Sequence, residues 1–290
     1  MLYILSTTLQ LGIIYAFVSL ALFISFRLLD IADLSTDGTF ILGMCMSVSL
    51  AIKGHPVLGI LLAIISCAIS GSITAILQTY MHIPSILAGI IVNTALYTIN
   101  LMVMSFSSNL SLLKQETIFS LANSSGLKYS EIIIPLLLFI VISILLNCFL
   151  KTRLGLSIRA TGDNPEMVSA SSINPNIMII IGLAISNSLT GLSGALIGQL
   201  QRSADINSST GIVVIGLACL IIGEAIIKNK NINTNILATL IGSIVYRFLY
   251  AIILKTRIFP IEYLKLITAI IITIAISSQT LKKGEHNVTN

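Results

Sequence analysis

The sequence predicts an all-α integral membrane protein, a single bundle of about nine transmembrane helices. Of its 290 residues, 56% are hydrophobic and only 9% are charged, and the mean hydropathy is +1.01. A soluble domain carries about 25% charged residues, so this chain has too few polar side chains to cover a globule in water. Most of its surface is therefore expected to face lipid.

Nine apolar stretches approach the roughly 20 residues that a spanning helix needs. Two of them, Thr39–Ile52 and Leu264–Ser277, are short, which in a bundle is typical of broken helices that line a cavity. No polar stretch is long enough to fold separately, so residues 1–290 are expected to form one domain. The expected spans are Thr8–Phe26, Thr39–Ile52, Val57–Leu77, Ser85–Met104, Ile132–Leu150, Ile177–Leu200, Ile212–Ile227, Ile236–Leu254 and Leu264–Ser277.

Two polar interruptions predict an internal repeat. Arg27–Gly38 separates the first two spans, and Gln201–Gly211 separates the sixth from the seventh. Each leads into a Gly-x4-Gly pattern, and the two patterns lie 173 residues apart. Matched broken segments in two halves are typical of inverted repeats. We expect a first repeat at about 8–104, a linking span at 132–150, a coupling loop at 151–176 and a second repeat at about 177–278.

The sequence indicates neither a metal site nor an enzyme. The four cysteines lie singly in apolar runs, and no Cys/His spacing suits a metal ion. There is no HExxH pattern, no Ser/His/Asp set and no pair of acids at active-site spacing. There is also no Gly-x4-Gly-Lys-Ser/Thr phosphate loop, so the chain is expected to lack an ATPase site of its own. We expect a transport protein without a cofactor.

The central polar segment, Lys151–Asn176, contains the signals of a short capped helix. Asn164 suits the N-cap position, Pro165 suits the first helical position, and Glu166 complements the positive end of the helix dipole. A short rigid helix held between two spans is suited to transmit motion from a partner protein. An ordinary loop helix is the alternative.

Three stretches resemble the permease subunits of ATP-binding-cassette (ABC) importers in the branched-chain amino acid and ribose permease superfamily. They are Leu29–Phe40, Thr161–Met167 and Ile215–Ala225, and the likeness extends from about residue 11 to residue 276. Within the superfamily, the chain is most similar to a branch linked to aromatic amino acid uptake.

The resemblance implies that the central segment is the cytoplasmic loop through which such permeases couple to their ATPase. The motif of that loop places a glycine six residues after its glutamate, where this chain has Ser172, and Met-Val replaces Ala-Ala. The departure concerns the turn after the helix and leaves its start intact. The residues assigned to ATPase coupling are Asp163, Asn164, Pro165, Glu166, Met167, Ala170 and Ser172.

The resemblance also implies the function and the partners. It implies the permease subunit of an importer for a small polar solute such as an amino acid, aromatic ones included, with ATP hydrolysed by a separate subunit. The expected partners are that ATPase, an extracytoplasmic binding protein and a second identical or paralogous permease, in the bacterial plasma membrane and without nucleic acid. The alternatives are an ion-coupled secondary transporter and an importer permease for a sugar or nucleoside.

Polar side chains within spans are costly and are candidates for the translocation pathway. Glu224 and Arg247 form either an ion pair between two helices or contacts to solute. Asn93 and Asn100 lie two turns apart on one helix face, where they can bind solute or a neighbouring helix. The candidate pathway residues are Asp33, Asp37, Asn93, Asn100, Asp205, Glu224 and Arg247.

The distribution of positive charge weakly favours an external N-terminus and an internal C-terminus. The cluster Lys151, Arg153 and Arg159 decides the orientation, because positive residues concentrate in cytoplasmic loops. A cysteine introduced at position 123 is therefore expected to react with an impermeant thiol reagent in intact cells, and one at position 169 only after permeabilisation. The reverse pattern would overturn this orientation.

Overall fold

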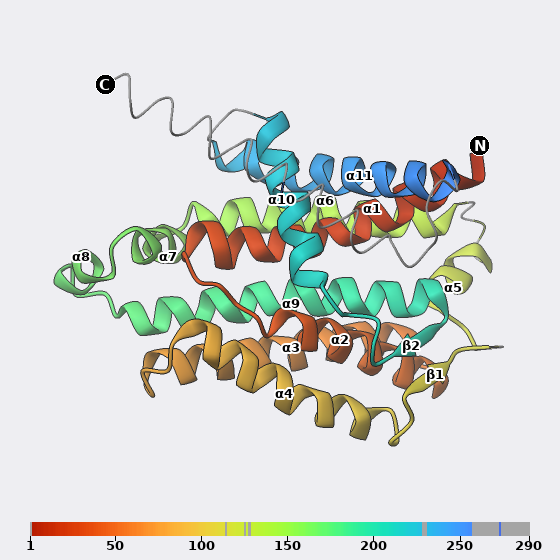
Figure 1. The fold of residues 1–290 in the computed structure, drawn as a ribbon, viewed down its shortest axis with the longest axis horizontal. Coiled ribbons are helices and arrows are strands. Elements are labelled where there is room, and N and C mark those ends of the chain that lie inside the picture. The colour runs from red at the N-terminus through yellow and green to blue at the C-terminus, as the bar shows by residue number, and fades with distance from the viewer. Residues whose placement is uncertain are drawn as a thin grey trace.

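The computed structural model describes residues 2–113, 115–124, 126, 129–227, 231–256 and 273. In this part of the chain, the long helices lie roughly along one axis (Figure 1). Six helical segments among the described residues are long and apolar enough to cross a membrane, so the chain is a multi-pass membrane protein. They are α1 (Leu2–Leu22) with its π-helical continuation η1 (Phe23–Leu28), α3 (Pro56–Thr79), α4 (Ser85–Val103), α6 (Ser130–Leu150), α9 (Pro175–Gln201) and α11 (Ile232–Thr256).

Two apolar helices are too short to span a bilayer. They are α2 (Thr36–Ile52) and α10 (Ile212–Ile226), and both begin within the length of the bundle rather than at its end (Figure 1). They follow the two polar interruptions that the sequence analysis identified. Eight of the nine predicted spans therefore correspond to described helices. The ninth, Leu264–Ser277, lies outside the described residues except for residue 273.

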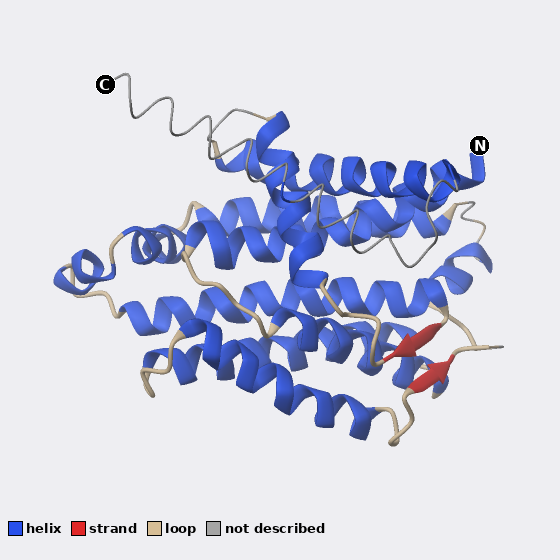
Figure 2. Ribbon diagram, in the orientation of Figure 1, coloured by secondary structure: helices blue, strands red, loops and turns tan. Residues whose placement is uncertain are grey.

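The loops contain short elements at both ends of the bundle. Strand β1 (Asn109–Ser111) pairs antiparallel with β2 (Ser203–Asp205), at the end opposite to α7 and α8 (Figure 2). This ribbon is an addition to the predicted all-α fold, and pairing gives each segment backbone hydrogen-bond partners. The other short elements are α5 (Ile118–Ser124), α7 (Arg153–Asp163) and α8 (Pro165–Ala170).

Glycines on α9 allow α2 to approach it at backbone distance. A Cβ added at Gly194 would overlap the backbone oxygen of Phe40, and one added at Gly43 would overlap the backbone oxygen of Gly191. Lipid tails are as apolar as a leucine side chain, so helices in a membrane associate through close packing rather than through the hydrophobic effect. These contacts therefore hold the short helix α2 against the centre of the bundle.

The outer helices carry large apolar side chains on their exposed surfaces. On α6, for example, Leu137, Ile144 and Leu145 are each more than half exposed, and α3 carries Leu61, Ile65 and Ile69 in the same way. In water such surfaces would drive association, but within a bilayer they match the solvent. The exposed apolar surface therefore agrees with a membrane location.

Substitution of Gly194 by Ala should destabilise the protein, because the new methyl group meets a backbone atom that has no rotamer by which to move away. Overpacked core positions cost about 1–3 kcal/mol. Ser188→Ala is the matched control on α9, because the Ser188 hydroxyl bonds only to its own helix, at Ile185. Apparent melting temperatures in detergent should fall for Gly194→Ala and change little for the control. Equal melting temperatures would show that the contact is not needed.

Candidate translocation site

A polar cavity of about 410 Å³ lies where α2, α4 and the connection from β2 to α10 meet. Among the described residues that line it, Asp37 carries the only charge. The cavity walls also include three apolar or aromatic side chains, Ile41, Tyr97 and Ile206. Its principal polar residues are Asp37 from α2, Asn93, Thr94 and Asn100 from α4, and Ser209 and Thr210 from the connection.

Asp37 joins the two short helices at their N-terminal ends. It lies in the first turn of α2, and its carboxylate accepts hydrogen bonds from the backbone N–H groups of Gly211 (3.2 Å) and Val213 (3.0 Å) at the start of α10. Gly211 has a φ of +89°, a left-handed conformation that suits glycine. The first N–H groups of a helix lack partners within it and carry a partial positive charge. A single carboxylate therefore caps the start of α10 from its place in the first turn of α2, beside the cavity.

Asp33 lies in a closed hydrogen-bond network outside the cavity lining. Its carboxylate accepts from the Ser35 hydroxyl at 2.6 Å and from Asn187 Nδ2 at 2.7 Å, and Asn187 Oδ1 accepts from Thr39 at 2.8 Å. Both Asp33 and Asn187 are almost wholly buried. The network fixes the first turn of α2 against α9, and so determines where Asp37 lies.

The seven predicted pathway residues therefore divide by position. Asp37, Asn93 and Asn100 line the cavity together, whereas Asp205 accepts a bond from the backbone N–H of Asn207 and shapes the adjoining turn. Sequence reasoning did not single out Thr94, Tyr97, Ser209, Thr210 or the buried Asn187. The polar run 207–210 was visible within the second interruption, but nothing in the sequence shows that α4 faces it.

Glu224 pairs with Arg27 rather than with Arg247. The Arg27 guanidinium donates to both carboxylate oxygens, at 2.8 and 2.5 Å. The Glu224–Arg247 ion pair that the sequence analysis raised is not formed. Glu224 instead lies near the end of α10, beside η1. Arg247 lies along α11, with its guanidinium 3.7 Å from the ring centre of Tyr15 and 5.7 Å from that of Tyr250. This is a cation–π arrangement.

The predicted short helix is present as α8, and Asn164 is its N-cap. The Asn164 side chain accepts a hydrogen bond from the backbone N–H of Met167 at 3.0 Å, and Pro165 occupies the first turn. Ser172 has a φ of +61°, so it makes the left-handed turn at the position where the related motif has glycine. The helix lies beyond the ends of the spanning helices (Figure 1) and is exposed except at Val168.

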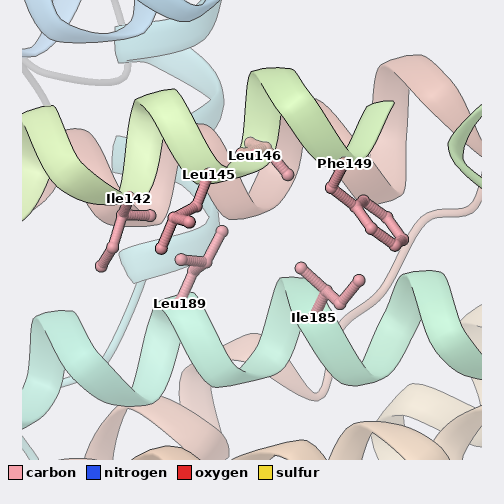
Figure 3. Close-up of a pocket in the computed structure, with 6 residues that line it drawn as sticks. All are labelled: Ile142, Leu145, Leu146, Phe149, Ile185 and Leu189. Carbon is pink, nitrogen blue, oxygen red and sulfur yellow. The ribbon is translucent and has the colours of Figure 1, made fainter. Parts of the chain in front are cut away.

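A second cavity is lined only by apolar side chains. It has a volume of about 200 Å³ and lies between α6 and α9, with only apolar side chains around it (Figure 3). These residues are Ile142, Leu145, Leu146, Phe149, Ile185 and Leu189. It offers no side-chain hydrogen bond to a polar solute, so the polar cavity at Asp37 is the candidate site.

A multi-pass helical bundle with a polar cavity between short helices and an exposed loop helix is an arrangement that occurs in membrane transport proteins. Residues 4–276 match the family described as branched-chain amino acid transport system / permease component, and the chain belongs to this family of ABC transporter permeases.

Two curated proteins are similar over nearly the whole chain. A tyrosine transport system permease protein of Clostridioides difficile is 34% identical over 262 residues, which cover 90% of this chain and 86% of that protein. The uncharacterized protein RP368 of Rickettsia prowazekii is 35% identical over 284 residues, or 95% of this chain and 97% of that protein. No solved structure shows a significant match.

The Arg27–Glu224 pair can be tested by exchanging its charges. Arg27→Glu and Glu224→Arg should each destabilise the protein, by about 1 kcal/mol, because each places like charges together at a partly exposed site. The double variant should regain most of that stability. Combining Glu224→Arg with Arg247→Glu is the control, and no recovery is expected. Stability is measured as the melting temperature in detergent. Recovery of stability in the control alone would contradict the observed pairing.

Proposed function

We propose that this permease imports an amino acid, and that the solute crosses through the cavity at Asp37. The observation that carries the proposal is the position of this cavity: polar side chains from α2, α4 and the connection before α10 converge where two short helices begin. Discontinuous helices that meet around a central binding site are a recurring design in transporters. The tyrosine permease relative supports an amino acid with an aromatic side chain.

We infer that the two halves are inverted repeats within a bundle of nine spans. In each half a long helix, α1 or α9, is followed by a polar interruption and then by a short helix, α2 or α10. The starts of the two short helices meet at Asp37. Such a meeting is expected at the pseudo-symmetry axis of inverted repeats, where transporters place their binding sites.

The two ends of the bundle are the proposed contact surfaces for the partner proteins. The exposed helix α8 is the surface that an ABC ATPase would contact, with Asp163, Glu166, Met167, Ala170 and Ser172 around the Asn164 cap. A binding protein would deliver solute at the opposite end, beside the ribbon of β1 and β2. A second permease copy would complete the pathway in a bacterial plasma membrane.

Uptake by the reconstituted importer tests the function. The permease, its ATPase and its binding protein in proteoliposomes should accumulate radiolabelled L-tyrosine when ATP is supplied to the ATPase side. Uptake should be indifferent to a proton uncoupler. Accumulation that needs a proton or sodium gradient but no ATP would support the ion-coupled alternative and contradict the proposal.

The coupling role of α8 makes a separate prediction. Asn164→Leu removes the N-cap and should cost about 1 kcal/mol of a short helix that has only Val168 buried. Solute-stimulated ATP hydrolysis should be lost while the protein still inserts and folds. Ser169→Ala, an exposed change on the same helix, should keep normal stimulation. Unchanged stimulation in Asn164→Leu, with the ATPase bound, would remove α8 from the mechanism.

A further inference from the structure

One residue that lines the cavity, Asn100, has a buried side-chain oxygen without a hydrogen-bond partner among the described residues. Asn100 is 1% exposed, and its Nδ2 donates to the backbone oxygen of Gly38 at 3.2 Å. A backbone oxygen accepts and never donates, so the side-chain nitrogen must face Gly38 and the oxygen must lie on the other side. Among the residues that the structure describes, none donates to this Oδ1. A buried polar atom in this state is costly, and Asn100 lies in the lining of the cavity, where a ligand can supply a donor.

Asp37 has acceptor capacity to spare beside Asn100. A carboxylate offers about four acceptor positions, and the backbone N–H groups of Gly211, Ile212 and Val213 occupy three of them. Asp37 is adjacent in sequence to Gly38, which Asn100 contacts. No Lys or Arg occurs among the described residues that line the cavity. The site therefore presents a negative charge and a neutral acceptor, without a cation to bind a carboxylate.

The geometry points to Asp37 and Asn100 as the groups that bind the ammonium end of the solute. An ammonium group has three N–H donors and a positive charge, which match one carboxylate and one amide oxygen. The inference rests on the proposed function, because it names the part of the amino acid that the cavity recognises. It also places Arg247 outside that recognition, since Arg247 is not among the cavity-lining residues.

An inorganic cation has related chemistry, because carboxylate, amide and hydroxyl oxygens also bind hard metal ions. The described residues contain no cluster of three or more His, Cys, Asp or Glu side chains. The experiment therefore includes sodium as a separate arm, and sodium binding alone would indicate an ion site rather than an ammonium site.

The test measures charge in the cavity directly, on the full-length permease alone. Thr94 is exposed and lines the cavity, so Thr94→Cys provides a reporter in a Cys148→Ala background; Cys45, Cys67 and Cys219 are buried. A cationic methanethiosulfonate reagent should modify the reporter faster than an anionic one, on the order of tenfold after correction for each reagent's rate with a free thiol.

Asp37→Asn should bring the two rates together, while its amide oxygen still accepts a bond from α10. Asp30→Asn is the matched control, because Asp30 is exposed outside the cavity lining and Asn tolerates its φ of 57°. The control should keep the preference for the cationic reagent. The inference would be overturned if the parent protein reacted with both reagents at equal rates or with neither reagent. It would also be overturned if Asp30→Asn lost the preference for the cationic reagent as fully as Asp37→Asn.

Protection by solute analogues then identifies the recognised group. Tyramine has the ammonium group but no carboxylate, and it should slow modification of the reporter. 3-(4-Hydroxyphenyl)propionate has the carboxylate but no ammonium group, and it should not slow modification. Asn100→Leu should weaken protection by tyramine on the order of tenfold. Protection by the propionate but not by tyramine, or by sodium as strongly as by tyramine, would overturn the inference. ATP-driven uptake would persist in those cases, so the proposed function would stand.

Discussion

A helix that begins inside a membrane leaves its first backbone N–H groups without partners, in a place where little water can supply them. In the described part of the chain, α2 and α10 begin within the length of the bundle, and the rest of the site depends on how these first N–H groups are satisfied. Asp37 accepts from the amides that start α10, while its own position in the first turn of α2 complements that helix too. One carboxylate thus links the starts of both short helices, and it also lines the polar cavity.

The surrounding structure keeps this arrangement in place. Asn187 on α9 binds Asp33 and Thr39, and so connects the centre of the bundle to both sides of the start of α2. Along the same helix, Gly191 and Gly194 bring the backbones of α2 and α9 together. The hydrogen bonds fix the rotation and depth of α2, and the glycines fix its distance. Together they place Asp37 within hydrogen-bonding distance of Gly211.

At the exposed end of the molecule, local interactions rather than helix packing determine the structure. The helix α8 buries only Val168, so its shape depends on local interactions: the Asn164 cap at its start and the left-handed Ser172 after its end. A non-glycine residue in that conformation costs about 1–2 kcal/mol. Ser172 keeps the left-handed turn at the position where the related motif has glycine. The turn directs the chain into α9, and through α9 towards the cavity.

The sequence by itself determined the membrane class, the long spans, the two interruptions and the Asn164 cap, because all of these depend on composition or on neighbours within a few residues. It also selected Asp37, Asn93 and Asn100, since polar groups are costly in lipid wherever they pack. Only the tertiary structure decided which polar groups meet. Glu224 pairs with Arg27, 197 residues away, and Asp37 caps a helix 174 residues later. Such pairings depend on the depth and rotation of packed helices, which no local pattern encodes.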